Sequence, residues 1–139
     1  MNGCFRHSLD AKGRLFMPAR LREALGAPFY VTKGPDSCLV VYSADAWSGI
    51  EKRVNSMPIS KARNLQRMWF SSAAQLEPDG QGRVLLPQSL RDYAGMTKDA
   101  VVAGVSNRVE IWDAARWDTL ENEEFTAENL MSAMDELGL

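Results

Sequence analysis

The chain has 139 residues, of which 45% are hydrophobic and 24% are charged, and its formal net charge is −2. This composition is typical of a globular protein, and a chain of this length would ordinarily form one domain. No apolar run approaches the roughly 20 residues that a membrane span requires, and the N-terminus lacks a basic flank followed by a long apolar stretch. We therefore predict a cytoplasmic protein with no membrane partner.

Charge is distributed unevenly along the chain. Residues 1–70 contain eleven Lys or Arg against five Asp or Glu, whereas residues 71–139 contain five against thirteen. The segment 118–139 holds seven of these acids and no Lys or Arg. A basic half followed by an acidic tail predicts a surface for a polyanion and a separate segment that repels or masks it.

The first predicted strand leads into a tight turn. Apolar and polar residues alternate over positions 5–10, which is the period of a strand with one buried face. In the following Asp10-Ala-Lys-Gly-Arg14, the aspartate carboxylate can accept hydrogen bonds from backbone N–H groups, and Gly13 can adopt a positive φ. The apolar residues 15–17 then predict a second short strand.

The same turn returns 69 positions later as Asp79-Gly-Gln-Gly-Arg83, with Gly82 in the place of Gly13. Self-similarity at a fixed offset indicates that one supersecondary unit has been used twice. After each turn and its apolar triplet, a proline stands where a short helix would begin and a glycine where it would end. These pairs are Pro18 with Gly26, and Pro87 with Gly95.

Two further strands and a helix complete each copy. Short apolar runs predict a hairpin in each, at residues 29–32 and 38–42 and again at residues 100–103 and 108–112. Each hairpin is followed by a predicted helix that has a polar N-cap and a tryptophan, Ser43 with Trp47 and Asp113 with Trp117.

The repeat divides the chain into four predicted segments. These are a first module at 3–54, a connecting helical segment at 55–70, a second module at 71–118 and an acidic, helical tail at 119–139. The basic side of the connecting helix is either a binding surface or a solvated face. In the tail, Thr126 could cap a helix with one apolar face, made by Ala127, Leu130, Met131, Met134 and Leu137. That helix could dock on a neighbouring subunit, bind a partner protein or remain loose.

The two Asp-x-x-Gly-Arg turns, each followed by an apolar triplet, Pro and Leu-Arg, and the stretch Val-Ser-Asn-Arg-Val-Glu-Ile-Trp at 105–112 resemble the MraZ family of bacterial transcriptional regulators. The resemblance covers nearly the whole chain apart from the tail. It implies an α+β, β-rich fold, in which two tandem AbrB-like swapped-hairpin modules form a pseudo-symmetric β-core with short peripheral helices. The second turn departs from the first by carrying Gln81 in place of Lys12.

The resemblance also implies a function. Several chains would close into a homo-oligomeric ring that binds double-stranded DNA at short G-rich direct repeats. Such repeats would lie in the promoter of the division and cell-wall gene cluster, which includes the family's own gene, so the protein would associate with the nucleoid.

The chemistry of the turn residues agrees with DNA binding. The planar guanidinium groups of Arg14 and Arg83 match either a phosphate or the O6/N7 edge of guanine. We expect Asp10 and Asp79 to hold the turns or orient the arginines, because a carboxylate facing phosphates is repelled. Lys12 is a candidate phosphate contact, with Arg20 and Arg22 as weaker ones. Alternatively, each Arg simply pairs with its Asp in a structural hairpin.

Enzymatic activity is not expected. His7 is the only histidine, and no Ser or Cys nucleophile has a base and an orienting acid at a recognisable spacing. Cys4 and Cys38 are far apart and show no metal-ligand spacing, so we predict no metal, cofactor or small-molecule substrate. The alternative function is that of a non-DNA oligomeric scaffold or an antitoxin-like interaction protein.

Overall fold

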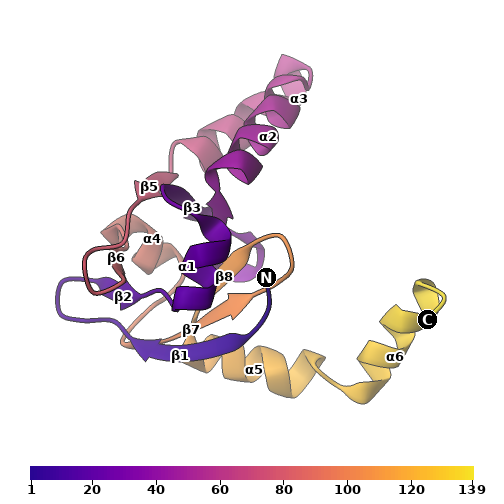
Figure 1. The fold of residues 1–139 in the computed structure, drawn as a ribbon. Coiled ribbons are helices and arrows are strands. Elements are labelled where there is room, and N and C mark those ends of the chain that lie inside the picture. Colours follow the sequence, from indigo (N-terminus) through magenta and orange to yellow (C-terminus); the bar gives the residue numbers. More distant parts are fainter.

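The computed structural model describes residues 1–139 and shows a mixed α+β protein, which confirms the predicted fold class (Figure 1). The first copy forms β1 (Cys4–Ser8), β2 (Arg14–Phe16), α1 (Ala19–Leu25), β3 (Phe29–Lys33), β4 (Leu39–Ser43) and α2 (Ala44–Asn55). The second forms β5 (Ala74–Leu76), β6 (Arg83–Leu85), α4 (Gln88–Tyr93), β7 (Asp99–Gly104), β8 (Val109–Asp113) and α5 (Ala114–Glu124). The remaining elements are a 3₁₀ turn at Pro35–Ser37, α3 (Ile59–Leu65), a π-helical turn at Gln66–Phe70 and α6 (Ala127–Glu136).

Six strands form one antiparallel sheet in which the two copies exchange their first strands. The strand order is β1-β7-β8-β4-β3-β5. β1 pairs with β7 of the second copy, from Cys4 opposite Ala103 to Ser8 opposite Asp99. β5 pairs in the same way with β3 of the first copy. Each copy therefore completes the hairpin of the other, and neither copy could form its sheet alone.

A pseudo-twofold axis relates the two copies. In the pairing of β4 with β8, Val40 lies opposite Glu110, the residue that occupies the equivalent position in the second copy. β2 and β6 form a separate two-stranded ribbon, in which Leu15 lies opposite its counterpart Val84. Because equivalent residues oppose each other in both ladders, the turns that precede β2 and β6 lie at the same end of the molecule (Figure 1).

The main core lies between the sheet, the ribbon and the short helices α1 and α4. Its members come from both copies, and the largest fully buried side chains among them include Phe29, Leu15, Met17, Leu21, Leu86 and Leu90. A shared core explains how two half-size units, each too small to bury much apolar surface, form one stable body. The predicted helix ends are also found, since Gly26 and Gly95 have φ values of 70° and 61°.

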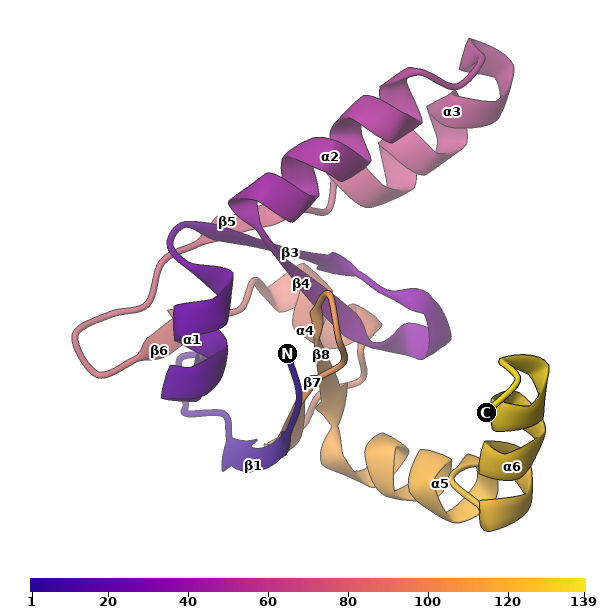
Figure 2. The same cartoon turned by 45° about the vertical axis from the view of Figure 1, so that its right-hand side comes forward.

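The helices α2 and α3 form an arm that projects from the body (Figures 1 and 2). Ser43 caps α2 as predicted, because its hydroxyl accepts a hydrogen bond from the backbone N–H of Ala46 at 3.2 Å. The base of the arm is held by Trp69, whose Nε1 donates to the carbonyl of Lys33 at 2.7 Å. The carbonyl of Trp69 in turn accepts from Thr32 Oγ1 at 2.7 Å.

The helix after the second hairpin begins differently from the prediction. Asp113 occupies the N-cap position of α5, but its carboxylate makes no capping hydrogen bond. Instead its Oδ1 accepts from Oγ1 and the backbone N–H of Thr97, at 3.3 and 3.4 Å. Asp113 is therefore the N-cap residue as predicted, but its side chain does not cap the helix, because Thr97 in the loop before β7 binds the carboxylate. α5 runs on to Glu124, past residue 118, where the second module was predicted to end. Thr126 caps α6 as predicted, because its Oγ1 accepts a hydrogen bond from the backbone N–H of Asn129 at 3.1 Å.

None of these helices is both long and apolar enough to cross a membrane.

Candidate nucleic-acid interface

The first turn is closed by the side chain and backbone of Asp10. Its Oδ1 accepts hydrogen bonds from the backbone N–H groups of Lys12 at 3.0 Å and Arg14 at 2.8 Å. Its Oδ2 accepts from Nε of Arg14 at 2.6 Å. The backbone N–H of Gly13, which has a φ of 82°, donates to the carbonyl of Asp10 at 3.0 Å. One carboxylate therefore fixes both the turn and the direction of the arginine side chain.

The second turn repeats this arrangement. Oδ1 of Asp79 accepts from the backbone N–H groups of Gln81 at 2.9 Å and Arg83 at 3.0 Å, and Oδ2 accepts from Nε of Arg83 at 3.0 Å. Gly82 has a φ of 79° and donates to the carbonyl of Asp79 at 3.0 Å. Two turns 69 positions apart in the sequence thus hold their arginines with the same set of hydrogen bonds.

Both aspartates are held in the ionised state. The backbone N–H of Arg14 is the main cause that lowers the pKa of Asp10, and the Arg14 guanidinium and the N–H of Lys12 add to it. The pKa of Asp79 is lowered in the same way, chiefly by the backbone N–H of Arg83. An ionised carboxylate accepts from Nε without giving up its backbone bonds, so each turn remains closed at neutral pH.

The Asp–Arg pairing leaves hydrogen-bond donors free. Arg14 uses only Nε within the protein, so its two Nη groups have no protein partner. Leu15 and Val84 point into the core, and because side chains alternate along a strand, Arg14 and Arg83 lie on the outer face of the ribbon. The structural-hairpin pairing is therefore present, and it orients the arginines through Nε while both Nη groups of Arg14 and Nη2 of Arg83 have no protein partner.

The two arginines converge on one carboxylate. Nη1 of Arg83 lies 3.6 Å from Oδ2 of Asp10, the same oxygen that accepts from Nε of Arg14. This close approach follows from the pairing of β2 with β6 about the pseudo-twofold axis. The chain thus brings two guanidinium groups from different copies side by side on one surface.

Sequence reasoning overlooked Arg91, which is the counterpart of Arg22. Nε of Arg22 donates to the carbonyl of Met17 at 2.7 Å, and Nε of Arg91 donates to that of Leu86 at 3.0 Å. Each guanidinium covers the glycine of the other copy's turn, so a Cβ placed on Gly13 would lie 2.5 Å from Cζ of Arg91. The alignment of the repeat already pairs positions 22 and 91, and that was the signal available in the sequence.

The other predicted contacts are Lys12 and Arg20. Lys12 is exposed on the first turn, where the second copy has the exposed Gln81. Arg20 is exposed on α1, and its Nη2 donates to Oδ1 of Asn2 at 2.8 Å, so it lies beside the N-terminal residues. The acidic α5 and α6 extend from a different side of the body than the two turns (Figure 1).

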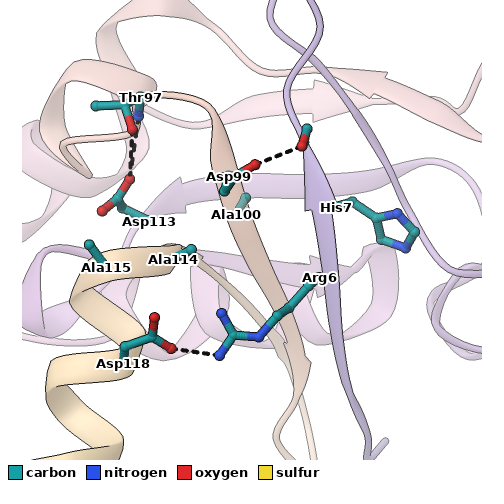
Figure 3. Close-up of a pocket in the computed structure, with 10 residues that line it drawn as sticks. Arg6, His7, Thr97, Asp99, Ala100, Asp113, Ala114, Ala115 and Asp118 are labelled. Carbon is teal, nitrogen blue, oxygen red and sulfur yellow. Dashed lines mark hydrogen bonds and ion pairs between the residues drawn. The ribbon is translucent and has the colours of Figure 1, made fainter.

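A pocket of about 460 Å³ beside β1 and the start of α5 shows no catalytic arrangement (Figure 3). Its carboxylates are engaged by Arg6, Ser8 and Thr97, in the pairs Arg6–Asp118 (2.6 Å), Ser8–Asp99 (2.7 Å) and Thr97–Asp113 (3.3 Å). The imidazole of His7 points away from Arg6 and Asp118 (Figure 3) and packs against the ring of Phe16, with centroids 4.9 Å apart.

Comparison with known proteins identifies the family. The sequence profile described as "MraZ protein, putative antitoxin-like" matches residues 1–67 and 69–137. The chain belongs to the MraZ family. The first match contains the first copy of the repeat and the second match contains the second copy.

Relatives within the MraZ family cover most of the chain. A protein of Acetivibrio thermocellus is 44% identical over 140 residues, which cover 99% of this chain and 98% of the relative. A protein of Natranaerobius thermophilus is 46% identical, with 92% of both chains covered, and one of Desulforamulus reducens is 51% identical, with 84% and 83% covered. All three are named "Transcriptional regulator MraZ". The chain therefore belongs to a family of transcriptional regulators and not of enzymes, as the sequence predicted.

Proposed function

We propose that this protein is a DNA-binding transcriptional regulator in which Arg14 and Arg83 read bases in the major groove. The observation that carries the proposal is the convergence of their guanidinium groups at Oδ2 of Asp10 on the outer face of the ribbon. A guanidinium that is oriented through Nε keeps its Nη donors for the O6 and N7 atoms of guanine. Two such groups side by side would suit neighbouring base pairs, which fits short G-rich direct repeats.

We further propose that the remaining basic residues of this end contact phosphates. Lys12 is the first candidate, because it is exposed on the same turn as Arg14. Arg20 and Arg22 are secondary candidates. Arg22 has only Nε bound to the carbonyl of Met17, so its Nη groups remain available to an anion. Phosphate contacts set the register of a protein on DNA, whereas base contacts specify the sequence.

The proposed modules at 3–54 and 71–118 would act together, because the exchange of β1 and β5 couples them. Several chains would assemble into a homo-oligomeric ring. One pair of turns touches only a short stretch of duplex, whereas linked pairs on tandem repeats bind with a high effective concentration. The proposed targets are G-rich direct repeats in the promoter of the division and cell-wall gene cluster, including the protein's own gene. The protein would then act in the cytoplasm, on the nucleoid.

Titration of the full chain against DNA from upstream of its own coding sequence tests the proposal. Fluorescence anisotropy with that duplex and with a shuffled duplex of equal composition should show preferential binding to the first. The logarithm of the affinity should fall linearly with the logarithm of salt concentration, by about 0.9 per phosphate neutralised. Equal affinities for both duplexes with little salt dependence would instead support the scaffold or antitoxin-like alternative.

A further inference from the structure

The helix α6 presents an apolar face that nothing in the chain covers. Leu130, Met131, Met134 and Leu137 follow the spacing of one helical face, and their exposed fractions are 61%, 64%, 38% and 76%. Isolated helices of this length are marginal in water and are usually stabilised by packing of such a face. The helix is well capped by Thr126, yet it has no packing partner within its own chain.

The arm formed by α2 and α3 carries an apolar groove of matching character. A pocket of about 480 Å³ opens there between the two helices and the loop that joins β7 to β8. Its apolar lining comprises Tyr42, Ile50, Val54, Met57, Leu65 and Trp69. Arg53 and Asn107 stand at the same pocket. Two further apolar side chains of the arm, Ile59 and Met68, are 80% and 64% exposed. The arm thus offers apolar surface with a polar margin, as docking sites for amphipathic helices do.

Charge distinguishes the two surfaces and makes them complementary. Residues 44–70 of the arm contain five basic residues, Lys52, Arg53, Lys61, Arg63 and Arg67, and only two acids, Asp45 and Glu51. The segment 118–139 contains seven acids and no basic residue. Complementary potentials of this kind favour association and fix its register. The same charges disfavour a symmetric contact between two α6 helices.

α6 cannot reach the groove of its own chain in this fold. Only Phe125 and Thr126 join it to α5, and α5 is anchored to the body by Trp117, which packs on Trp112 at a centroid distance of 5.8 Å. Arg6 on β1 also binds α5, through Asp118 at 2.6 Å. In both views α6 and the arm project from different parts of the molecule (Figures 1 and 2). A second chain must therefore supply the partner.

We propose that α6 of one chain docks in the α2–α3 groove of a second copy of the same chain. The inference rests on the proposed self-association and names its interface. Donor and acceptor are different surfaces of each chain, so the contact is head-to-tail, and repeated contacts of this kind generate a ring where the rotation closes. One short helix buries little area, but a closed ring engages two such contacts for every chain.

Cross-linking between differently tagged full chains tests this docking. One chain carries Met134→Cys and the other Met57→Cys, both with Cys4→Ser because Cys4 is exposed. Burial raises the pKa of the Cys38 thiol to about 12, so this native cysteine remains unreactive at neutral pH. After mixing and treatment with a short bis-maleimide, we expect mixed-tag dimers. Ser132→Cys, on the opposite face of α6, is the matched control and should give at least five-fold fewer.

Sedimentation velocity separates the outcomes. Met131→Asp should convert most of the assembly to smaller species, whereas Ser132→Asp, which adds the same charge on the polar face, should leave the assembly unchanged. A wild-type oligomer with equal cross-linking at positions 134 and 132 would overturn the docking and leave self-association standing. A predominance of cross-links between two Met134→Cys chains would also overturn it, in favour of paired α6 helices. A wild-type monomer would refute both proposals.

Discussion

Arg83 forms an ion pair with Asp10 of the other turn, with Nη1 and Oδ2 3.6 Å apart, but Arg14 forms no such pair with Asp79. The same hydrogen bonds from backbone N–H groups close both turns. Asp10 therefore touches both arginines of the proposed recognition surface, whereas Asp79 touches only its own. The two copies share a scaffold but do not contribute equally to it.

Asp10→Asn should lower DNA affinity more than Asp79→Asn. The first substitution weakens the orientation of both arginines, and the second affects Arg83 alone. We expect the affinity for the specific duplex to fall several-fold further for Asp10→Asn, as measured by anisotropy at fixed salt. Asp36→Asn, on an exposed acid with no ion pair, is the control and should bind like the wild type. Equal losses for the two turn variants would contradict the asymmetry.

Acid should destabilise the fold through these aspartates. Hydrogen bonds from the backbone N–H groups of Arg14 and Arg83 are the chief cause that lowers the pKa of Asp10 and Asp79 in the folded state. A lowered folded pKa contributes stability above the unfolded value of about 3.9, and this contribution is lost as the pH falls through the folded pKa. The free energy of unfolding, measured by urea titration, should therefore decrease below about pH 4. The decrease should be smaller in the Asp10→Asn/Asp79→Asn double variant, and an unchanged pH dependence would refute the role of these groups.

Gly13→Ala should destabilise the protein, and Gly80→Ala should not. Gly13 has a φ of 82°, and an added Cβ would meet the Arg91 guanidinium at 2.5 Å. A non-glycine residue with such a φ costs about 1 to 3 kcal/mol, and the displaced Arg91 adds to this. Gly80 has open space for a Cβ, and the first copy already carries Ala11 at the same place. Thermal unfolding of the two variants provides the comparison, and equal midpoints would contradict the packing of Arg91 on the turn.

Lys12→Gln and Gln81→Lys should change the salt dependence of DNA affinity in opposite directions. If Lys12 neutralises one phosphate, Lys12→Gln should reduce the slope of log affinity against log salt by about 0.9 for each bound chain. Gln81→Lys places the same charge on the second turn and should increase the slope by a similar amount. Affinity measured between about 50 and 200 mM salt gives both slopes. If neither slope changes, the turns do not lie on the phosphate backbone.

Much of the local structure could be predicted from the sequence because the repeat supplies each pattern twice. The turn at Asp10 and Gly13, the helix ends at Gly26 and Gly95 and the cap at Ser43 depend on neighbouring residues alone. Asp113 occupies the predicted N-cap position, but its side chain does not cap α5 because Thr97, sixteen residues earlier, binds its carboxylate. Local patterns do not reveal such distant partners.

The arrangement of the candidate interface was harder to predict for the same reason. The repeat of the turn placed Arg14 and Arg83 in equivalent positions, but their meeting at Asp10 depends on the register of β2 with β6. The packing of Arg91 over Gly13 likewise joins two copies across the pseudo-twofold axis. A sequence pattern identifies the members of such a cluster, and only the pairing of the strands brings them together.

The central claim is that Arg14 and Arg83 confer sequence discrimination, and paired binding titrations of the Arg14→Ala/Arg83→Ala variant test it most directly. Their side chains are about 31% and 29% exposed and their ion pairs lie at the surface, so the fold should survive, as checked by circular dichroism. Lys98→Ala, an exposed charge outside the turns, is the control. The double variant should bind the upstream and shuffled duplexes with equal, weak affinity, since each bidentate contact to guanine provides about 1 to 3 kcal/mol of discrimination. A folded double variant that still prefers the upstream duplex as strongly as the wild type would contradict the account.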